Sequence, residues 1–276
     1  MSYLGATRHL DTLLSRLASE NAVIVRVEST QGSVPREAGT WMAVFAEGLA
    51  GTIGGGHLEH EAIALARSML RDPTGEGQAL TRVPLGPALG QCCGGMVYLK
   101  FERVDAATAD VLAQRLRPAL APLALFGGGH VGHALVQVLA GLPFALSWID
   151  SRDGVFPEPA PPQVACEHSD PVHAAVGELA PGSRVLIMSF SHAEDLDILA
   201  ACLKRQRAQA DLPYIGLIGS RTKWATFRHR LEARGFSAAE LSQVTSPIGI
   251  PGIAGKEPEV IAVAVAAQLL QTLGEA

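Results

Sequence analysis

The chain has 276 residues, which is enough for one large domain or two smaller ones. Hydrophobic residues make up 48% of it and charged residues 18%, which excludes a disordered chain, because such chains lack the apolar surface that offsets the entropy lost on folding. The formal net charge of −5 argues against nucleic acid as a partner, since phosphate backbones are bound by clustered Lys and Arg.

The termini and the cysteines predict a cytoplasmic protein that does not cross a membrane. The first residues, MSYLGATRH, lack the basic and apolar regions of a secretory signal. The longest apolar run, over 260–267, is shorter than the roughly 18–20 residues that span a bilayer. Cys92, Cys93, Cys166 and Cys202 lack the spacing of a disulfide framework or a structural zinc site, so we expect reduced thiols and no metal site.

The first 105 residues predict a small α+β domain. Helical or strand periodicity is present over 8–17 (helix), 22–27 and 40–45 (strands), 57–70 (helix) and 96–101 (strand). Glycine-rich turns separate these elements. The next segment, over 106–121, combines a helical pattern with prolines and is interpreted as a linker.

From residue 122 to the end the pattern changes to strand, turn and helix in alternation. Short apolar strands are expected over 123–126, 144–149, 163–166, 184–189 and 214–218. Helical patterns lie between most of them, and this alternation predicts an α/β fold with a Rossmann-like doubly wound parallel sheet. The closing helix, over 257–273, is apolar around much of its circumference and is expected to be buried.

The strongest chemical signal is the run GGGHVG over 127–132, which fits G-x-G-x-x-G between an apolar strand and a helix. Gly127 allows the tight turn, Gly129 lets the backbone approach a phosphate, and Gly132 lets helix and strand pack closely. The amides that begin the helix, from His130 on, suit an anion. The run predicts a nucleotide or phosphate site; the alternative is a turn kept only for packing.

Two charged residues follow the next strand. Asp150 lies roughly 20 residues after the glycines, where an acidic side chain accepts ribose hydroxyls in dinucleotide-binding folds. Arg152 comes directly afterwards and can instead attract a phosphate. Both interpretations remain open at the level of the sequence.

The second signal is the adjacent pair Cys92 and Cys93, which is followed by two glycines. Neighbouring cysteines form only a strained disulfide. Two thiols in such a loop can meet a soft metal or a reactive sulfur atom. They can equally be two small hydrophobic side chains in a β-bulge, because free cysteine is often buried.

A second glycine loop, over 54–56, also precedes a helix and resembles another anion site. Glu59 and Glu61 lie in the first turn of that helix, where they favour the helix dipole but would repel a bound phosphate. A purely conformational role for these glycines is the alternative.

Two further segments follow predicted strands at the carboxyl edge of the sheet, where open α/β folds bind ligands. His192 can ligate, donate a proton or take part in a helix cap. Ser220 and Arg221, with Lys223 close by, suit an acidic ligand group at a new helix N-terminus. An ordinary pair of surface cations is the alternative there.

Five segments occur in an order that resembles the XdhC/CoxI family. They read GSVPRE over 32–37, GTIGGGHLE over 51–59, LGQCCGG over 89–95, FGGGHVG over 126–132 and IGSRTK over 218–223. The resemblance spans almost the whole chain, and the QCCGG run is its most specific part. The chain departs from the family at SFSH over 189–192, where a Thr-His pair is expected and Ser191 can supply the hydroxyl.

The resemblance implies a molybdenum-cofactor chaperone rather than an enzyme. Such a protein protects the pterin–molybdenum cofactor, assists its sulfuration with a cysteine desulfurase, and inserts it into apo-xanthine dehydrogenase. The thiols would meet molybdenum or its sulfur, and the glycine turn would hold the cofactor's phosphate or a nucleotide. The residues expected to bind the cofactor are Gln91, Cys92, Cys93, Gly94, Gly127, Gly129, His130, Gly132, Asp150, His192, Ser220 and Arg221. A homodimer is expected, and no residue is assigned a catalytic role.

Two other functions compete with this one. The glycine turn and Asp150 also fit an NAD(P)-dependent oxidoreductase, but the sequence lacks a convincing Tyr-x-x-x-Lys pair or zinc-ligand cluster. The third hypothesis is a regulatory protein in which a nucleotide bound at the turn controls release of the cofactor.

Overall fold

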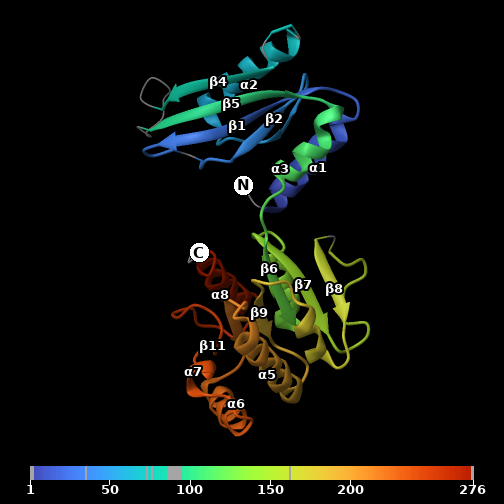
Figure 1. The fold of residues 1–276 in the computed structure, drawn as a ribbon, viewed down its shortest axis with the longest axis vertical. Helices are drawn as coiled ribbons and strands as arrows, with labels where there is room; N and C mark the ends of the chain where they lie inside the picture. The colour runs from blue at the N-terminus through green and yellow to red at the C-terminus, as the bar shows by residue number, and fades with distance from the viewer. Residues whose placement is uncertain are drawn as a thin grey trace. The chain divides into compact units, whose positions relative to one another are not determined.

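The computed structural model describes residues 3–34, 36–72, 74–75, 77–85, 95–161 and 163–274. The chain divides into two compact units, Met1–Pro118 and Ala119–Ala276, each with its own sheet (Figure 1). The segment over 106–121, expected as a linker, is shared between them. Its helix, α3 (Ala109–Leu116), packs into the core of the first unit, and its last residue, Ala121, begins β6 (Ala121–Phe126), the first strand of the second unit.

An antiparallel sheet forms the centre of the first unit. Its strands are β1 (Ala22–Gln31), β2 (Trp41–Val44), β3 (Leu49–Gly51), β4 (Gln78–Pro84) and β5 (Met96–Val104), in the spatial order β3-β2-β1-β5-β4. The edge strand β4 was not among the predicted strands. It alternates between exposed and half-buried residues and carries a proline, so it lacks the apolar run that marks the buried strands.

Helices pack on both faces of this sheet. Val23 and Val25 of β1 belong to the core cluster that includes residues of α2 (Gly56–Arg71), whereas Ile24 lies among residues of α1 (Tyr3–Leu17) and α3. This division follows from the alternation of side chains along a strand. Helices α1 and α3 lie side by side (Figure 1).

The second unit contains a six-stranded parallel sheet. Its strands are β6 (Ala121–Phe126), β7 (Phe144–Asp150), β8 (Val164–His168), β9 (Arg184–Ile187), β10 (Tyr214–Leu217) and β11 (Val244–Thr245). The spatial order is β11-β10-β9-β6-β7-β8, and all neighbouring strands are parallel. The chain therefore starts at the central strand β6, adds β7 and β8 on one side, and then crosses back to add β9, β10 and β11 on the other side. This is the doubly wound order of a Rossmann fold, and it confirms the predicted fold class.

Helices cover both faces of the parallel sheet. One face packs against α4 (His130–Leu139) and α8 (Pro258–Gln271). The other packs against η3 (Val172–Glu178), a 3-10 helix, and against α5 (His192–Gln209), α6 (Arg221–Ala233) and α7 (Ala238–Leu241). The prediction that the closing helix is buried holds on one side only, because Val263 and Leu270 of α8 are 54% and 39% exposed. Among the described residues, no helix is long and apolar enough to cross a bilayer.

Candidate functional site

The carboxyl edge of the parallel sheet gathers most of the predicted residues that the structure describes. Gly127 follows β6, Asp150 ends β7, His192 follows β9 and Ser220 follows β10. Because these strands are parallel, their carboxyl ends lie at one edge, and the topological switch point falls between β6 and β9. Open α/β sheets bind ligands at this position.

Two glycines of the turn are required by close packing. Gly127 has a φ of 123°, and a Cβ on it would overlap the carbonyl oxygen of Met188, which follows β9. A Cβ on Gly132 would overlap the carbonyl oxygen of Gly127. These glycines therefore bring the turn against β9 and helix α4 against the turn, and they would be needed whether or not a ligand binds.

Gly129 differs from the other two. It is exposed, its φ and ψ are −79° and −177°, and no atom lies within 4 Å of the place where a Cβ would stand. It precedes α4, which no side chain caps among the described residues, and the first residue of that helix, His130, is exposed as well. The start of α4 therefore offers backbone N–H groups that no described side chain caps, with open space beside Gly129, the combination that an anion needs.

Asp150 is committed to the protein itself. Its carboxylate is only 2% exposed and accepts hydrogen bonds from the Gly128 N–H at 2.6 Å and from the Arg152 N–H, Nε and Nη2 at 2.9, 3.0 and 2.9 Å. Burial raises the pKa of Asp150, but the hydrogen bonds from Arg152 and Gly128 outweigh it and hold the pKa below its usual value of 3.8. Both of its oxygens are already paired, so a ribose would have to displace these donors.

Val155 occupies the space above the middle of the turn. A Cβ on Gly128 would overlap the Val155 side chain and come within 3.3 Å of the Asp150 carboxylate. In dinucleotide-binding folds the adenosine ribose lies between the turn and this acidic residue. Here the protein's own side chains fill that position, whereas the start of α4 stays open.

A second network links the ends of β9 and β10, and the sequence did not point to it. Asp195, 2% exposed, accepts hydrogen bonds from the Ser189 N–H and Oγ, both at 2.8 Å, and from Lys223 Nζ at 2.6 Å. Lys223 also donates to the carbonyl of Ile218 at 2.8 Å. The network therefore joins the start of α5 to the start of α6. Its signal in the sequence was the acidic residue in the first turn after Ser191, which alone indicates only a helix start.

The remaining predicted residues of this edge are exposed and partly structural. Ser220 caps α6 by accepting a hydrogen bond from the Lys223 N–H at 3.1 Å, and Arg221 begins that helix. Ser191 caps α5 in the same way. His192 follows this cap, and its ring meets the edge of the Phe227 ring with centroids 6.1 Å apart.

The sulfur-bearing part of the predicted site, Gln91, Cys92, Cys93 and Gly94, lies outside the described residues. Burial raises the pKa of the Cys202 thiol to about 12 and raises that of Cys166 as well, so both are protonated at neutral pH. In the part of the chain that the structure describes, no three His, Cys, Asp or Glu side chains group as metal ligands.

The second glycine loop is occupied by a side chain of its own helix. Glu59 Oε2 accepts hydrogen bonds from the Ile53 N–H at 2.9 Å, from the Gly55 N–H at 3.1 Å and from the Thr52 hydroxyl. This carboxylate takes the place that a bound anion would occupy. The structure therefore favours the conformational role for this loop over a second anion site.

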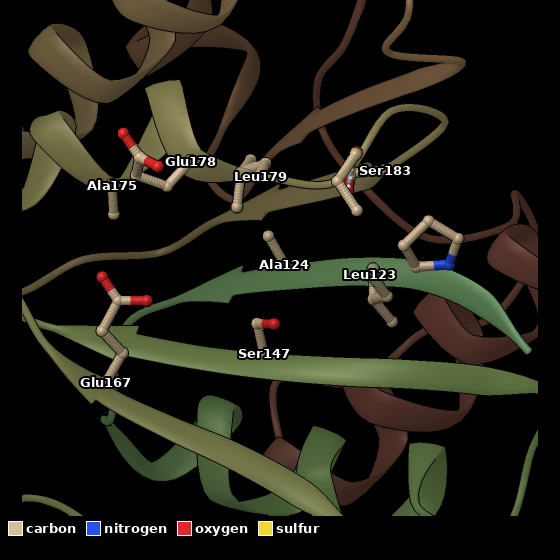
Figure 2. A pocket seen from close by; sticks show the side chains of 10 residues that line it. Leu123, Ala124, Ser147, Glu167, Ala175, Glu178, Leu179 and Ser183 are labelled. Carbon is tan, nitrogen blue, oxygen red and sulfur yellow. Dashed lines mark hydrogen bonds between the residues drawn. The ribbon is translucent and has the colours of Figure 1, made fainter.

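A cavity of about 220 Å³ lies elsewhere in the second unit, beneath η3. Ala124 and Ser147 of the sheet and Ala175 of η3 line it, with Glu167 and Glu178 at one end and Ser183 at the other (Figure 2). None of its lining residues belongs to the predicted set. The cavity forms where η3, a short 3-10 helix, connects β8 and β9.

Comparison with known families decides the relationship. A family model described as the XdhC Rossmann domain matches residues 123–269, and one described as the XdhC and CoxI family matches residues 15–82. The chain belongs to the XdhC family. The XdhC Rossmann domain coincides with the parallel sheet of the second unit, including the glycine turn and the Asp195 network.

Two relatives of this XdhC-family chain are informative. The uncharacterized protein YqeB of Escherichia coli is 29% identical over 273 residues, which are 96% of this chain and 46% of YqeB, so the chain spans about half the length of that relative. A crystal structure described as a xanthine dehydrogenase from Bacillus halodurans is 20% identical, with a TM-score of 0.77 over 99% of this chain and 96% of that one. At this identity the similarity extends to the fold.

Proposed function

We propose that this chain is an accessory protein of a xanthine dehydrogenase that binds the molybdenum cofactor, protects it, assists its sulfuration with a cysteine desulfurase and inserts it into the apoenzyme. Membership of the XdhC family suggests the accessory role. The observation that carries the cofactor proposal is the open start of α4 at Gly129, beside an Asp150 that is fully paired. That combination fits a phosphate whose carrier has no need of a ribose acceptor.

The cofactor matches this arrangement because its phosphate is attached to a pterin and not to an adenosine. The phosphate would accept hydrogen bonds from the N–H groups that begin α4. A dinucleotide would need Asp150 to release Gly128 and Arg152, and it would need the space that Val155 fills. The same contacts therefore disfavour the alternative of an NAD(P)-dependent oxidoreductase.

Cys92 and Cys93 are proposed as the partners of molybdenum or of its sulfur. A soft thiolate suits both. Cys166 and Cys202 are poor candidates for this part, because burial raises the pKa of each thiol. The homodimer expected from the sequence stays a prediction.

Copurification from molybdate-replete cells tests the proposal. Molybdenum is measured by plasma mass spectrometry and the pterin by the fluorescence of its oxidised form. The wild-type protein is expected to carry both in near-equal amounts, and Gly129→Asp to lose at least about tenfold, because its carboxylate would repel the phosphate. Gly129→Ala and Gly177→Asp are matched controls that should retain the cofactor, since a Cβ meets no atom within 4 Å at either position.

A second arm addresses the sulfur chemistry. Joint replacement of Cys92 and Cys93 by Ser is expected to weaken retention of molybdenum, whereas Cys166→Ser should not. Wild-type protein that copurifies without pterin, or with NAD(P) in its place, would contradict the proposed function. Unchanged retention by the double variant would contradict only the assignment of the thiols.

A further inference from the structure

An exposed aromatic side chain, Phe190, follows β9 near the topological switch point. Phe190 is 68% exposed, the most exposed large apolar side chain among the described residues. It comes two residues after Met188, whose carbonyl oxygen lies against Gly127. The backbone at Phe190 therefore runs close to the glycine turn, on the β9 side of the edge at which open α/β sheets bind ligands.

A fixed cation covers one face of this ring. The Arg152 guanidinium carbon lies 4.6 Å from the centroid of the Phe190 ring. Arg152 is held by Asp150, which in turn accepts the Gly128 N–H at 2.6 Å. The contacts thus run from the glycine turn through Asp150 and Arg152 to Phe190. Since one face of the ring meets the guanidinium and the side chain is still largely exposed, its other face is open to solvent.

An unsatisfied acceptor lies beside this pair. Glu194 Oε1 accepts a hydrogen bond from the Ser151 hydroxyl at 2.7 Å, and the Glu194 N–H donates to the Ser191 hydroxyl at 3.2 Å. Ser151 and Ser191 are the chain neighbours of Arg152 and Phe190. Glu194 Oε2 is buried and has no hydrogen-bond partner among the described residues. A buried carboxylate oxygen without a partner needs a hydrogen-bond donor.

We propose that Phe190, with Arg152 behind it and Glu194 beside it, is the platform on which the pterin ring of the cofactor stacks. This inference rests on the proposed function and adds the residues that recognise the ring. A planar heterocycle gains stacking energy on an exposed aromatic face, and a cation behind that face adds to it. The edge of a pterin carries neighbouring N–H and NH₂ donors, and either would satisfy the unpaired Oε2 of Glu194 once that side chain turns toward the ring.

Calorimetry on the full chain with two phosphate monoesters tests the platform. Neopterin monophosphate carries the pterin ring, whereas ribose 5-phosphate lacks a ring. Phe190→Ala is expected to weaken neopterin monophosphate about tenfold and to leave ribose 5-phosphate unchanged, because only the former stacks. Phe190→Trp should bind both as the wild-type protein does, and Glu194→Gln should weaken neopterin monophosphate alone.

The control is Val263→Ala, which shortens another exposed apolar side chain of the same unit and should change neither affinity. Equal affinity of the wild-type protein for the two monoesters, or an unchanged Phe190→Ala, would overturn the platform and leave the phosphate site standing. If Gly129→Asp binds neopterin monophosphate normally while Phe190→Ala does not, the phosphate site is wrong and the platform stands. A wild-type protein that binds neither compound overturns both.

Discussion

Residues of one motif have separate physical roles in this protein. Gly127 and Gly132 of the glycine turn are required because backbone atoms lie where their Cβ atoms would be. Gly129 is free of such contacts and is the position at which a ligand can approach. The pattern G-x-G-x-x-G alone cannot separate these roles, because it states only that glycine is present.

Asp150 should stabilise the turn only while it is ionised. Asp150→Asn is expected to lower the free energy of unfolding by about 2 kcal/mol at pH 7, because Arg152 and the Gly128 N–H lose a charged acceptor. The pKa of Asp150 in the folded protein lies below its usual value, so its contribution is complete above about pH 4 and is lost as the pH falls through the folded pKa. Urea unfolding of both proteins between pH 7 and pH 2.5 measures the difference.

The matched control is Asp153→Asn, since the Asp153 side chain is 97% exposed and lies three residues further on. Its effect should stay within about 0.5 kcal/mol. Equal effects of the two substitutions, or a difference that persists unchanged in acid, would count against the structural role of Asp150.

Among the elements, the helices at the carboxyl edge of the parallel sheet begin in different ways: side chains cap the starts of α5 and α6, whereas none caps the start of α4 in the part of the chain that the structure describes. Ser191 and Ser220 cap α5 and α6, and Glu59 fills the loop before α2. No described side chain caps α4. Each unsatisfied N–H group at a helix start needs a partner, and this contrast distinguishes the glycine turn at Gly129 from the glycine loop over 54–56.

Glu59 should therefore be a stability determinant of the first unit. Glu59→Ala is expected to lower the free energy of unfolding by about 2 kcal/mol and to speed amide hydrogen exchange over residues 49–59, because the Ile53 and Gly55 N–H groups lose their acceptor. Glu61→Ala is the control, since Glu61 pairs with His57 at the surface and should contribute less than about 0.5 kcal/mol. Equally faster exchange in both variants would contradict the role of Glu59 as the acceptor for these N–H groups.

At the scale of the whole molecule, each unit has cores built from its own residues. The two core clusters of the first unit draw on residues between Leu10 and Leu116, and those of the second on residues between Ala121 and Leu273. Leu112 and Leu116 of α3 are buried in the first of these units. The boundary that matters for stability is therefore the one after Pro118.

Fragments test this boundary. A chain of residues 119–276 is expected to fold alone, with a cooperative thermal transition followed by circular dichroism. A chain of residues 1–118 should be more stable than one of residues 1–105, because the shorter fragment loses two buried leucines, each worth roughly 1.5–3 kcal/mol. Aggregation of the 119–276 fragment, or equal stability of the 1–118 and 1–105 fragments, would contradict a boundary after Pro118.

The sequence alone determined the fold class and the place of the glycine turn, because both depend on local signals: short apolar strands, helical periodicity and glycine spacing. Elements with weak signals, such as the polar edge strand β4 and the two-residue β11, were not predicted. Only the tertiary structure decided which polar groups remain available. Gly128 meets Asp150 from 22 residues away, Lys223 meets Asp195 from 28, and Ser151 meets Glu194 from 43. Contacts at such separations depend on how strands and loops pack. The Gly128 N–H pairs with Asp150 in this way, and Arg152, two residues along the chain, completes the pairing, so the predicted ribose acceptor is engaged within the protein.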